Sequence, residues 1–212
     1  MNIFLLSVTD NLDPDLCQVL EDEIKKRGNR VAYISSAPQT GDRPYYISTI
    51  NDYRAISKNV QVDYFDLSED FSDDQLQLLL TYGTIYLSGG NTYVFMDSAN
   101  KRNILPILKR HMGNGGLLIG ASAGSIMMTP SIDLAEHGDE NIPQITNTTG
   151  FGFVDFEFHP HFNNTEQELK YLSQHKNKKK LKIYTCKDGG GILIAGNAIK
   201  LFGSVSEFIN PI

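Results

Sequence analysis

The sequence predicts an α/β fold built on a doubly wound, mostly parallel sheet that ends in a C-terminal β-hairpin. Strand and helix patterns alternate from the start of the chain, and this order is typical of parallel sheets with helices on both faces. The chain has 212 residues, of which 41% are apolar and 21% are charged. These are ordinary globular proportions, so we expect a single domain over residues 1–212 rather than a disordered chain.

The first half contains five apolar runs that predict strands. They are Asn2–Val8, Arg30–Ser35, Val60–Asp66, Thr84–Leu87 and Leu117–Ile119. Asp13 and Pro14 predict a helix start, and Gly28 predicts its end. A second helix is expected from the capping box at residues 72–75 to Gly83, and a third over Ile104–Met112. The segment Tyr45–Ser57 gives no clear pattern.

The second half is less regular. We expect strands at Phe153–Phe158 and Lys182–Thr185, with a helix over Thr165–Gln174 between them. The runs Ile192–Ala195 and Ala198–Phe202 are joined by Gly-Asn, which predicts a hairpin at a sheet edge. The lysine-rich stretch 176–182 is interpreted as a solvated helix end and loop.

Composition excludes several classes of function. The 19 Lys and Arg residues against 25 Asp and Glu give a net charge of −6, so no basic excess supports nucleic-acid binding. The longest uncharged stretch, Met112–Ile132, contains five glycines and does not suit a membrane helix. The turn Ser7–Asn11 after the first strand has no glycine, which argues against a dinucleotide site.

The start of the chain and its cysteines bear on location. No basic segment or cleavage site follows Met1, so no signal peptide is expected. Cys17 and Cys186 stand alone without metal-ligand spacing, and we interpret both as structural. A cytoplasmic protein without disulfides is therefore predicted.

A G-x-S-x-G pattern follows the strand Leu117–Ile119. It reads Gly120-Ala121-Ser122-Ala123-Gly124 and continues into residues of helical character. A strand, a sharp turn and a helix form the setting of a nucleophile elbow, which presents a serine oxygen. The alternative is a glycine-rich structural turn. In the elbow, the Ala123 N–H at the helix start would stabilise an oxyanion.

A second glycine loop, Gly89-Gly90-Asn91-Thr92, follows the strand Thr84–Leu87. The Gly90 N–H is a candidate second donor to an oxyanion, whereas the structural alternative is a tight connection capped by Asn91 or Thr92.

Two further candidate elements also follow predicted strands. His159 and His161 flank a proline, and such a pair can supply a catalytic base or metal ligands. Asp188 precedes three glycines and could orient an imidazole. Because open α/β sheets build their sites at the carboxyl ends of strands, we expect these elements to converge with the serine. The order Ser, His, acid differs from that of α/β-hydrolases.

These motifs resemble the peptidase E (α-aspartyl dipeptidase) family, relatives of the cyanophycinases. The resemblance rests on three motifs, Gly89-Gly90-Asn91-Thr92, Gly120-Ala121-Ser122-Ala123-Gly124 and Pro160-His161-Phe162. It implies a class I glutamine amidotransferase-like, or flavodoxin-like, fold and a serine peptidase that acts on short peptides without a metal or organic cofactor. It also implies that Ser122 is the nucleophile and His161 the base. The family's acid is typically a glutamate before a glycine, and Asp188 occupies that place.

The resemblance is weaker at the residues that would bind the substrate. The family carries an arginine after Pro-His-Phe that suits a substrate carboxylate, and residues 163–185 contain none. Arg43 is a candidate substitute, and Asn91 and His159 are further candidate substrate-binding residues. Strict preference for an N-terminal aspartate is therefore not predicted. The sequence predicts no oligomeric state.

Several alternatives stay open. The acid could instead come from the loop after the elbow, where the candidates are Asp133, Asp139 and Glu140. A metal-dependent hydrolase could use His159 and His161 with one of three acids, Asp155, Glu157 or Asp139. A third alternative is a non-catalytic or regulatory protein on the same scaffold.

Overall fold

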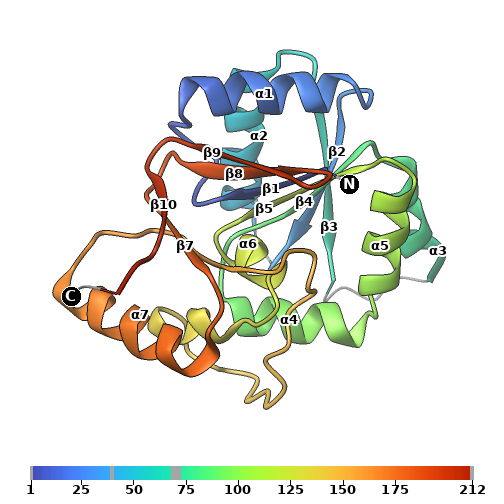
Figure 1. The fold of residues 1–212 in the computed structure, drawn as a ribbon. Coiled ribbons are helices and arrows are strands. Elements are labelled where there is room, and N and C mark those ends of the chain that lie inside the picture. The colour runs from blue at the N-terminus through green and yellow to red at the C-terminus, as the bar shows by residue number, and fades with distance from the viewer. Residues whose placement is uncertain (1, 39–40, 68–72, 211–212) are drawn as a thin grey trace.

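A seven-stranded, mostly parallel sheet forms the centre of the molecule (Figure 1). The computed structural model describes residues 2–38, 41–67 and 73–210. The strand order is β3-β2-β4-β5-β1-β8-β9. The strands are β1 (Asn2–Leu6), β2 (Arg30–Ser35), β3 (Gln61–Asp66), β4 (Thr84–Leu87), β5 (Leu117–Ala121), β8 (Gly191–Ala195) and β9 (Ala198–Phe202). β1 to β5 run parallel, and the predicted hairpin, β8–β9, lies at one edge of the sheet, where β8 pairs antiparallel with β1.

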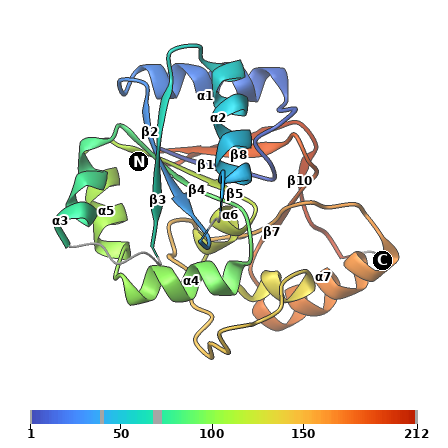
Figure 2. The same ribbon diagram turned by 180° about the vertical axis from the view of Figure 1, so that it is seen from behind.

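Helices cover both faces of this sheet (Figures 1 and 2). One face carries α1 (Pro14–Lys25) and α2 (Pro44–Ile56). The other carries α3 (Asp73–Leu78), α4 (Thr92–Lys101), α5 (Leu105–Gly113) and α6 (Ala123–Met127), with two short 3₁₀ turns, η1 (Leu79–Thr81) and η2 (Asp133–His137). The doubly wound α/β class is thus confirmed. Among the described residues, no helix has the length and apolar character needed to cross a membrane.

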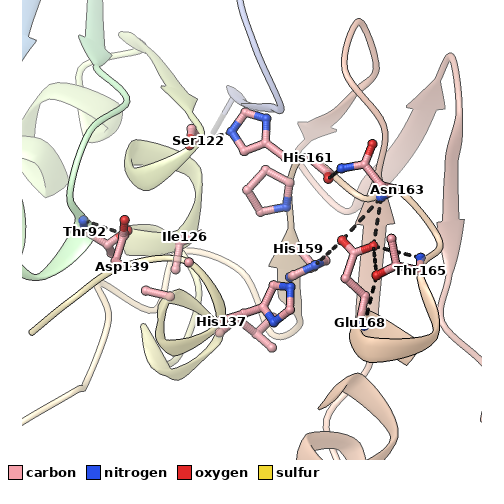
Figure 3. A pocket seen from close by; sticks show the side chains of 14 residues that line it. Thr92, Ser122, Ile126, His137, Asp139, His159, His161, Asn163, Thr165 and Glu168 are labelled. Atoms are coloured by element: carbon pink, nitrogen blue, oxygen red, sulfur yellow. Dashed lines mark hydrogen bonds and ion pairs between the residues drawn. The ribbon is translucent and has the colours of Figure 1, made fainter. Parts of the chain in front are cut away.

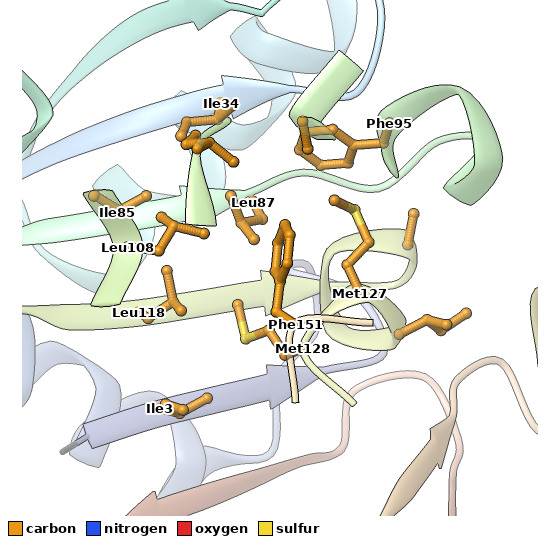
Figure 4. Packing of buried hydrophobic residues seen from close by; sticks show 14 of the residues in the cluster. Ile3, Ile34, Ile85, Leu87, Phe95, Leu108, Leu118, Met127, Met128 and Phe151 are labelled. Carbon is orange, nitrogen blue, oxygen red and sulfur yellow. The ribbon is translucent and has the colours of Figure 1, made fainter. Parts of the chain in front are cut away.

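The core lies on the two faces of the central strands. In β1, Ile3 and Leu5 join one cluster with α4, α5 and α6, while Phe4 and Leu6 join the other with α1 and α2. All four side chains are fully buried. Figure 4 shows the first cluster, where helix side chains pack over the strands. Burial on both faces explains why these strands appear in the sequence as continuous apolar runs.

Two helices of the described chain, α2 and α4, were not predicted from the sequence. Asp13 caps α1 as expected, because its side chain accepts from the N–H groups of Asp15 and Leu16. Helix α2 was not predicted, since its N-cap residue Arg43 is left-handed (φ 53°) and makes no side-chain capping bond. Helix α4 was given no range in the sequence, although Asn91 was named as a candidate cap and its side chain does cap this helix. The capping box expected at residues 72–75 begins outside the described residues.

The second half forms a small separate sheet beside α7 (Glu166–Lys179). Its strands are β6 (Glu157–His159), β7 (Ile183–Cys186) and β10 (Val205–Glu207). The predicted strand Phe153–Phe158 is wrong except at its end. The backbone N–H groups of Phe151 and Phe153 donate to the carbonyls of Met127 and Met128, so this segment follows the loop after α6.

Candidate active site

Ser122 lies on a sharp turn between β5 and α6. Its backbone has φ 50° and ψ −113°, a region that residues with a side chain rarely occupy. The turn is fixed to β1, because the Ser122 N–H donates to the Leu6 carbonyl at 3.0 Å. The buried Ser125 hydroxyl adds further bonds to Leu6 and to the Gly120 carbonyl. The strained conformation is therefore held by the surrounding structure.

Glycines allow this turn to pack against the sheet. A Cβ on Gly120 would lie 2.6 Å from the backbone of Gly124, and a Cβ on Gly124 would lie 2.2 Å from the Leu87 carbonyl oxygen. Neither position has room for a side chain. The G-x-S-x-G pattern thus has a steric reason in this structure, namely the close approach of α6 to β4 and β5.

The second glycine loop passes directly beside the serine. A Cβ on Gly89 would lie 3.4 Å from Ser122 Cβ. Gly90 adopts φ 127°, and a Cβ there would lie 2.1 Å from Ser36 Oγ. Ala123 is the first residue of α6, so its N–H has no acceptor within that helix. Two backbone segments that can offer N–H groups therefore flank Ser122.

His161 and Asp188 lie in line with Ser122. His161 Nε2 is 2.8 Å from Ser122 Oγ, and His161 Nδ1 is 2.7 Å from Asp188 Oδ1. Figure 3 shows the His161 ring beside Ser122. The three side chains come from the turn after β5, the segment after β6 and the segment after β7. They form one continuous hydrogen-bonded chain.

Ser7 belongs to the same hydrogen-bonded chain and was not identified as a site residue from the sequence. Its buried hydroxyl donates to Asp188 Oδ1 at 2.6 Å and accepts from the His161 backbone N–H at 2.8 Å. His161 has a left-handed backbone (φ 56°), and the Ser7 hydroxyl helps to hold it. Its place at the end of β1, on the same strand edge as the other candidates, was the available signal.

The side chains of two of the competing acids, Asp133 and Asp139, have other partners. Asp133 forms an ion pair with Lys179 at 2.6 Å, and Asp139 accepts from the Thr92 N–H at 2.8 Å. The backbone carbonyl of Glu140 accepts from the Asn91 side chain. The acid beside His161 is Asp188.

The predicted histidine pair does not share one site. Both ring nitrogens of His161 face Ser122 and Asp188, whereas His159 Nε2 lies 3.5 Å from Glu168 Oε1. Glu157 is paired with a different residue of α7, His175, at 2.6 Å. The structure therefore does not bring together the ligand set expected for a metal-dependent hydrolase.

Two cavities meet at Ser122 and His161. The first, of about 550 Å³, is lined by residues of η2, β6 and the start of α7, including His137, His159 and Glu168 (Figure 3). Burial lowers the pKa of His159 to about 4, so its imidazole is neutral at pH 7.

The second cavity, of about 650 Å³, lies on the side of β1, β2 and α2. Its lining includes Asp10, Asp52, Tyr33, Tyr86 and Gly90. Burial raises the pKa of Asp52. Both volumes fall in the range of small-molecule sites.

The other candidate substrate residues are placed differently. Asn91 lines the second cavity, but its side chain caps α4 through Val94 N–H and donates to the Glu140 carbonyl. The Arg43 guanidinium lies over the Tyr64 ring at 3.8 Å. Arg43 is not one of the described residues that line either cavity.

Comparison with known proteins places the chain in a family. The sequence profile of peptidase family S51 matches residues 3–202. An uncharacterised peptidase of Listeria monocytogenes is 25% identical over 204 residues, covering 93% of this chain and 96% of that protein. Peptidase E of a Nostoc species is 24% identical over 168 residues, covering 76% of this chain and 66% of that protein. Across five such relatives, the matched part spans 65% to 96% of their length.

The fold also has a counterpart among solved structures. A Listeria monocytogenes protein described as a candidate peptidase E superimposes with a TM-score of 0.75 at 22% identity, and the match covers 98% of each chain. At this identity the likeness concerns the fold.

Proposed function

The chain belongs to peptidase family S51, a family of serine peptidases, and on that premise we propose that it hydrolyses dipeptides or other short peptides. Ser122 is the nucleophile, His161 the general base and Asp188 the residue that orients the imidazole. The observation that carries this assignment is the hydrogen-bonded chain from Ser122 Oγ through His161 to Asp188, with separations of 2.8 and 2.7 Å. A nucleophile, a base and an orienting acid in contact are the requirements of this chemistry.

The proton path follows from the two ring nitrogens. Asp188 accepts from His161 Nδ1–H, which leaves Nε2 to accept the proton of the Ser122 hydroxyl. Ser122 Oγ then bonds to the scissile carbonyl carbon, and His161 returns the proton to the leaving amine. Water then bonds to the acyl carbon while His161 Nε2 takes its proton. The return of that proton to Ser122 Oγ releases the carboxylic acid and restores the serine.

The tetrahedral intermediate carries a negative oxygen. The N–H groups of Gly90 and Ala123 are the proposed donors to this oxygen, because both belong to backbone that flanks Ser122. Support comes from the position of that loop, since a Cβ on Gly89 would lie 3.4 Å from Ser122 Cβ and the Gly124 N–H donates to the Ser88 carbonyl at 3.1 Å. Donors fixed before the reaction stabilise charge that develops during it.

The two cavities support a short substrate with one part on each side of Ser122. Residues 163–185 contain no arginine, and Arg43 packs on Tyr64. A buried carboxylate without a cationic partner is costly. We therefore expect Asp-Xaa dipeptides to exceed isosteric Asn-Xaa dipeptides by less than about tenfold in kcat/KM. A dipeptide-library assay measures this ratio, and a strong Asp preference would contradict the expectation.

The nucleophile assignment is tested with Ser122→Ala. We expect the folded protein to lose activity by about 10⁴–10⁶-fold, because members of such a unit act together. A small fluorophosphonate should add one adduct to the unmodified chain, located by peptide mapping at Ser122. Ser98→Ala on α4 is the control and should keep full activity. Undiminished turnover in Ser122→Ala, or an adduct elsewhere, would overturn the proposal.

A further inference from the structure

The first cavity contains a cluster that the proposed hydrolysis does not use. His137 at the end of η2, His159 in β6 and Glu168 in α7 each offer one ligand atom, and these atoms lie within 4.8 Å of one another. In Figure 3 they lie together on one side of the pocket, away from Ser122. Three separate elements of the fold therefore bring two imidazoles and a carboxylate to one place.

His159 is the central member of the cluster. Its side chain is 5% exposed, yet Nε2 has no hydrogen-bond partner among the described residues. The nearest acceptor, Glu168 Oε1, lies 3.5 Å away, which is too far for a normal hydrogen bond. Buried polar atoms without a partner are rare in folded proteins. A metal ion that accepts the lone pair of this nitrogen would supply the missing partner.

Glu168 is held in a fixed orientation. It accepts from the N–H groups of Asn163 and Thr165, and also from the Thr165 hydroxyl. Ligating carboxylates in metal sites are commonly oriented by such outer hydrogen bonds. His137 stacks on the Tyr171 ring, with centroids 5.0 Å apart, and is partly exposed on its turn. The carboxylate is thus preorganised, while His137 has room to adjust.

We propose that His137, His159 and Glu168 bind a zinc ion. Two histidines and one glutamate form a common ligand set for Zn²⁺, with bonds of about 2.0–2.2 Å. Tetrahedral geometry then places the ligand atoms about 3.3–3.5 Å apart. The His159–Glu168 separation of 3.5 Å already meets this value. Two imidazoles favour Zn²⁺ over Mg²⁺ or Ca²⁺, which prefer oxygen ligands.

The three proposed ligands and Ser122 line the same cavity, so the fourth coordination position is open to it. Water or a carboxylate of a bound ligand completes the tetrahedron there. The ion takes no part in the proposed proton path, because His161 is engaged with Ser122 and Asp188.

Calorimetric titration of zinc into chelator-treated protein tests the proposal. We expect one ion per chain with a dissociation constant of micromolar or tighter, and a higher melting temperature with zinc. His137→Ala and Glu168→Gln should each weaken binding by at least about 30-fold. Glu166→Gln, on the exposed side of the same helix, is the matched control and should bind as the unmodified chain does.

Circular dichroism establishes that each variant is folded, and His137→Ala alters a partly exposed turn that carries little of the core. Binding weaker than about 100 µM, or equal affinity in all three variants, would overturn the zinc site. Anomalous diffraction that places the ion elsewhere would do the same. Ser122→Ala should bind zinc normally, so failure of the proposed hydrolysis and failure of this site are distinguishable.

Discussion

Replacing Gly90 by alanine puts the strongest steric demand on the proposed oxyanion site. The new Cβ would lie 2.1 Å from Ser36 Oγ and 2.9 Å from Ser36 Cβ. The backbone at φ 127° also disfavours any side chain. Strain of this kind costs about 1–3 kcal/mol, and overpacking costs about 1–3 kcal/mol. If the loop does not move, we therefore expect Gly90→Ala to lower the free energy of unfolding by about 2–6 kcal/mol.

The chain can relieve this strain by shifting the loop, which would move the Gly90 N–H away from Ser122. Loss of one oxyanion donor lowers kcat by about 10²–10³-fold. We expect this fall in kcat with little change in KM, measured by steady-state kinetics on a dipeptide alongside urea unfolding.

Two variants make the test specific. Gly113→Ala has open space around the added methyl group and should be neutral or slightly stabilising. The double variant Ser36→Gly/Gly90→Ala removes both contacting atoms and should recover about 1–3 kcal/mol of stability. Gly90→Ala with unchanged kcat would refute the role given to this loop. Unchanged stability would refute the steric reasoning.

Two further predictions concern hydrogen bonds. Ser7→Ala should lower kcat/KM by about 10- to 150-fold, because Asp188 loses a charge-assisted bond and the His161 N–H loses its acceptor; unchanged kinetics would show that Ser7 does not position the acid. Burial raises the pKa of Glu23, but hydrogen bonds from Lys26, Arg27 and Asn2 outweigh it and lower the pKa to about 2. This stabilises the fold above the unfolded pKa of about 4.3, and the effect is lost as pH falls toward 2. Urea unfolding should therefore find Glu23→Gln less stable at pH 7, with a gap that narrows steadily as pH falls from about 4 through 2, and a gap as large at pH 2 as at pH 7 would contradict the assignment.

The fold was largely predictable where burial and capping agree. The central strands are buried on both faces, so they appear in the sequence as continuous apolar runs. Helix α2 was missed because Arg43 begins it without a capping side chain. The Phe153–Phe158 run has strand-like composition, but its backbone partners lie near Met127 and Met128, far back in the sequence. Such pairing cannot be inferred from composition.

The residues of the candidate site also fall into those that the sequence marks and those that only the structure reveals. Ser122 and His161 stand in motifs that follow strands, so the sequence marks them. Ser7 has no motif, and its partners His161 and Asp188 lie 154 and 181 positions away in the chain. A single serine after a strand can be identified as a site residue only when the tertiary structure shows these partners beside it.

The pairing of β1 with β8 has a consequence for biosynthesis. During synthesis β1 must wait for β8, one of its two neighbours in the sheet, until the ribosome has made the chain as far as Ala195. The segment that delivers Asp188 to Ser7 and His161 immediately precedes this late strand. In the proposed mechanism, a nascent chain thus holds the nucleophile and the base before the acid that orients them. Under that mechanism, full activity would begin only after the β8–β9 hairpin has docked on β1, so synthesis itself would delay hydrolysis.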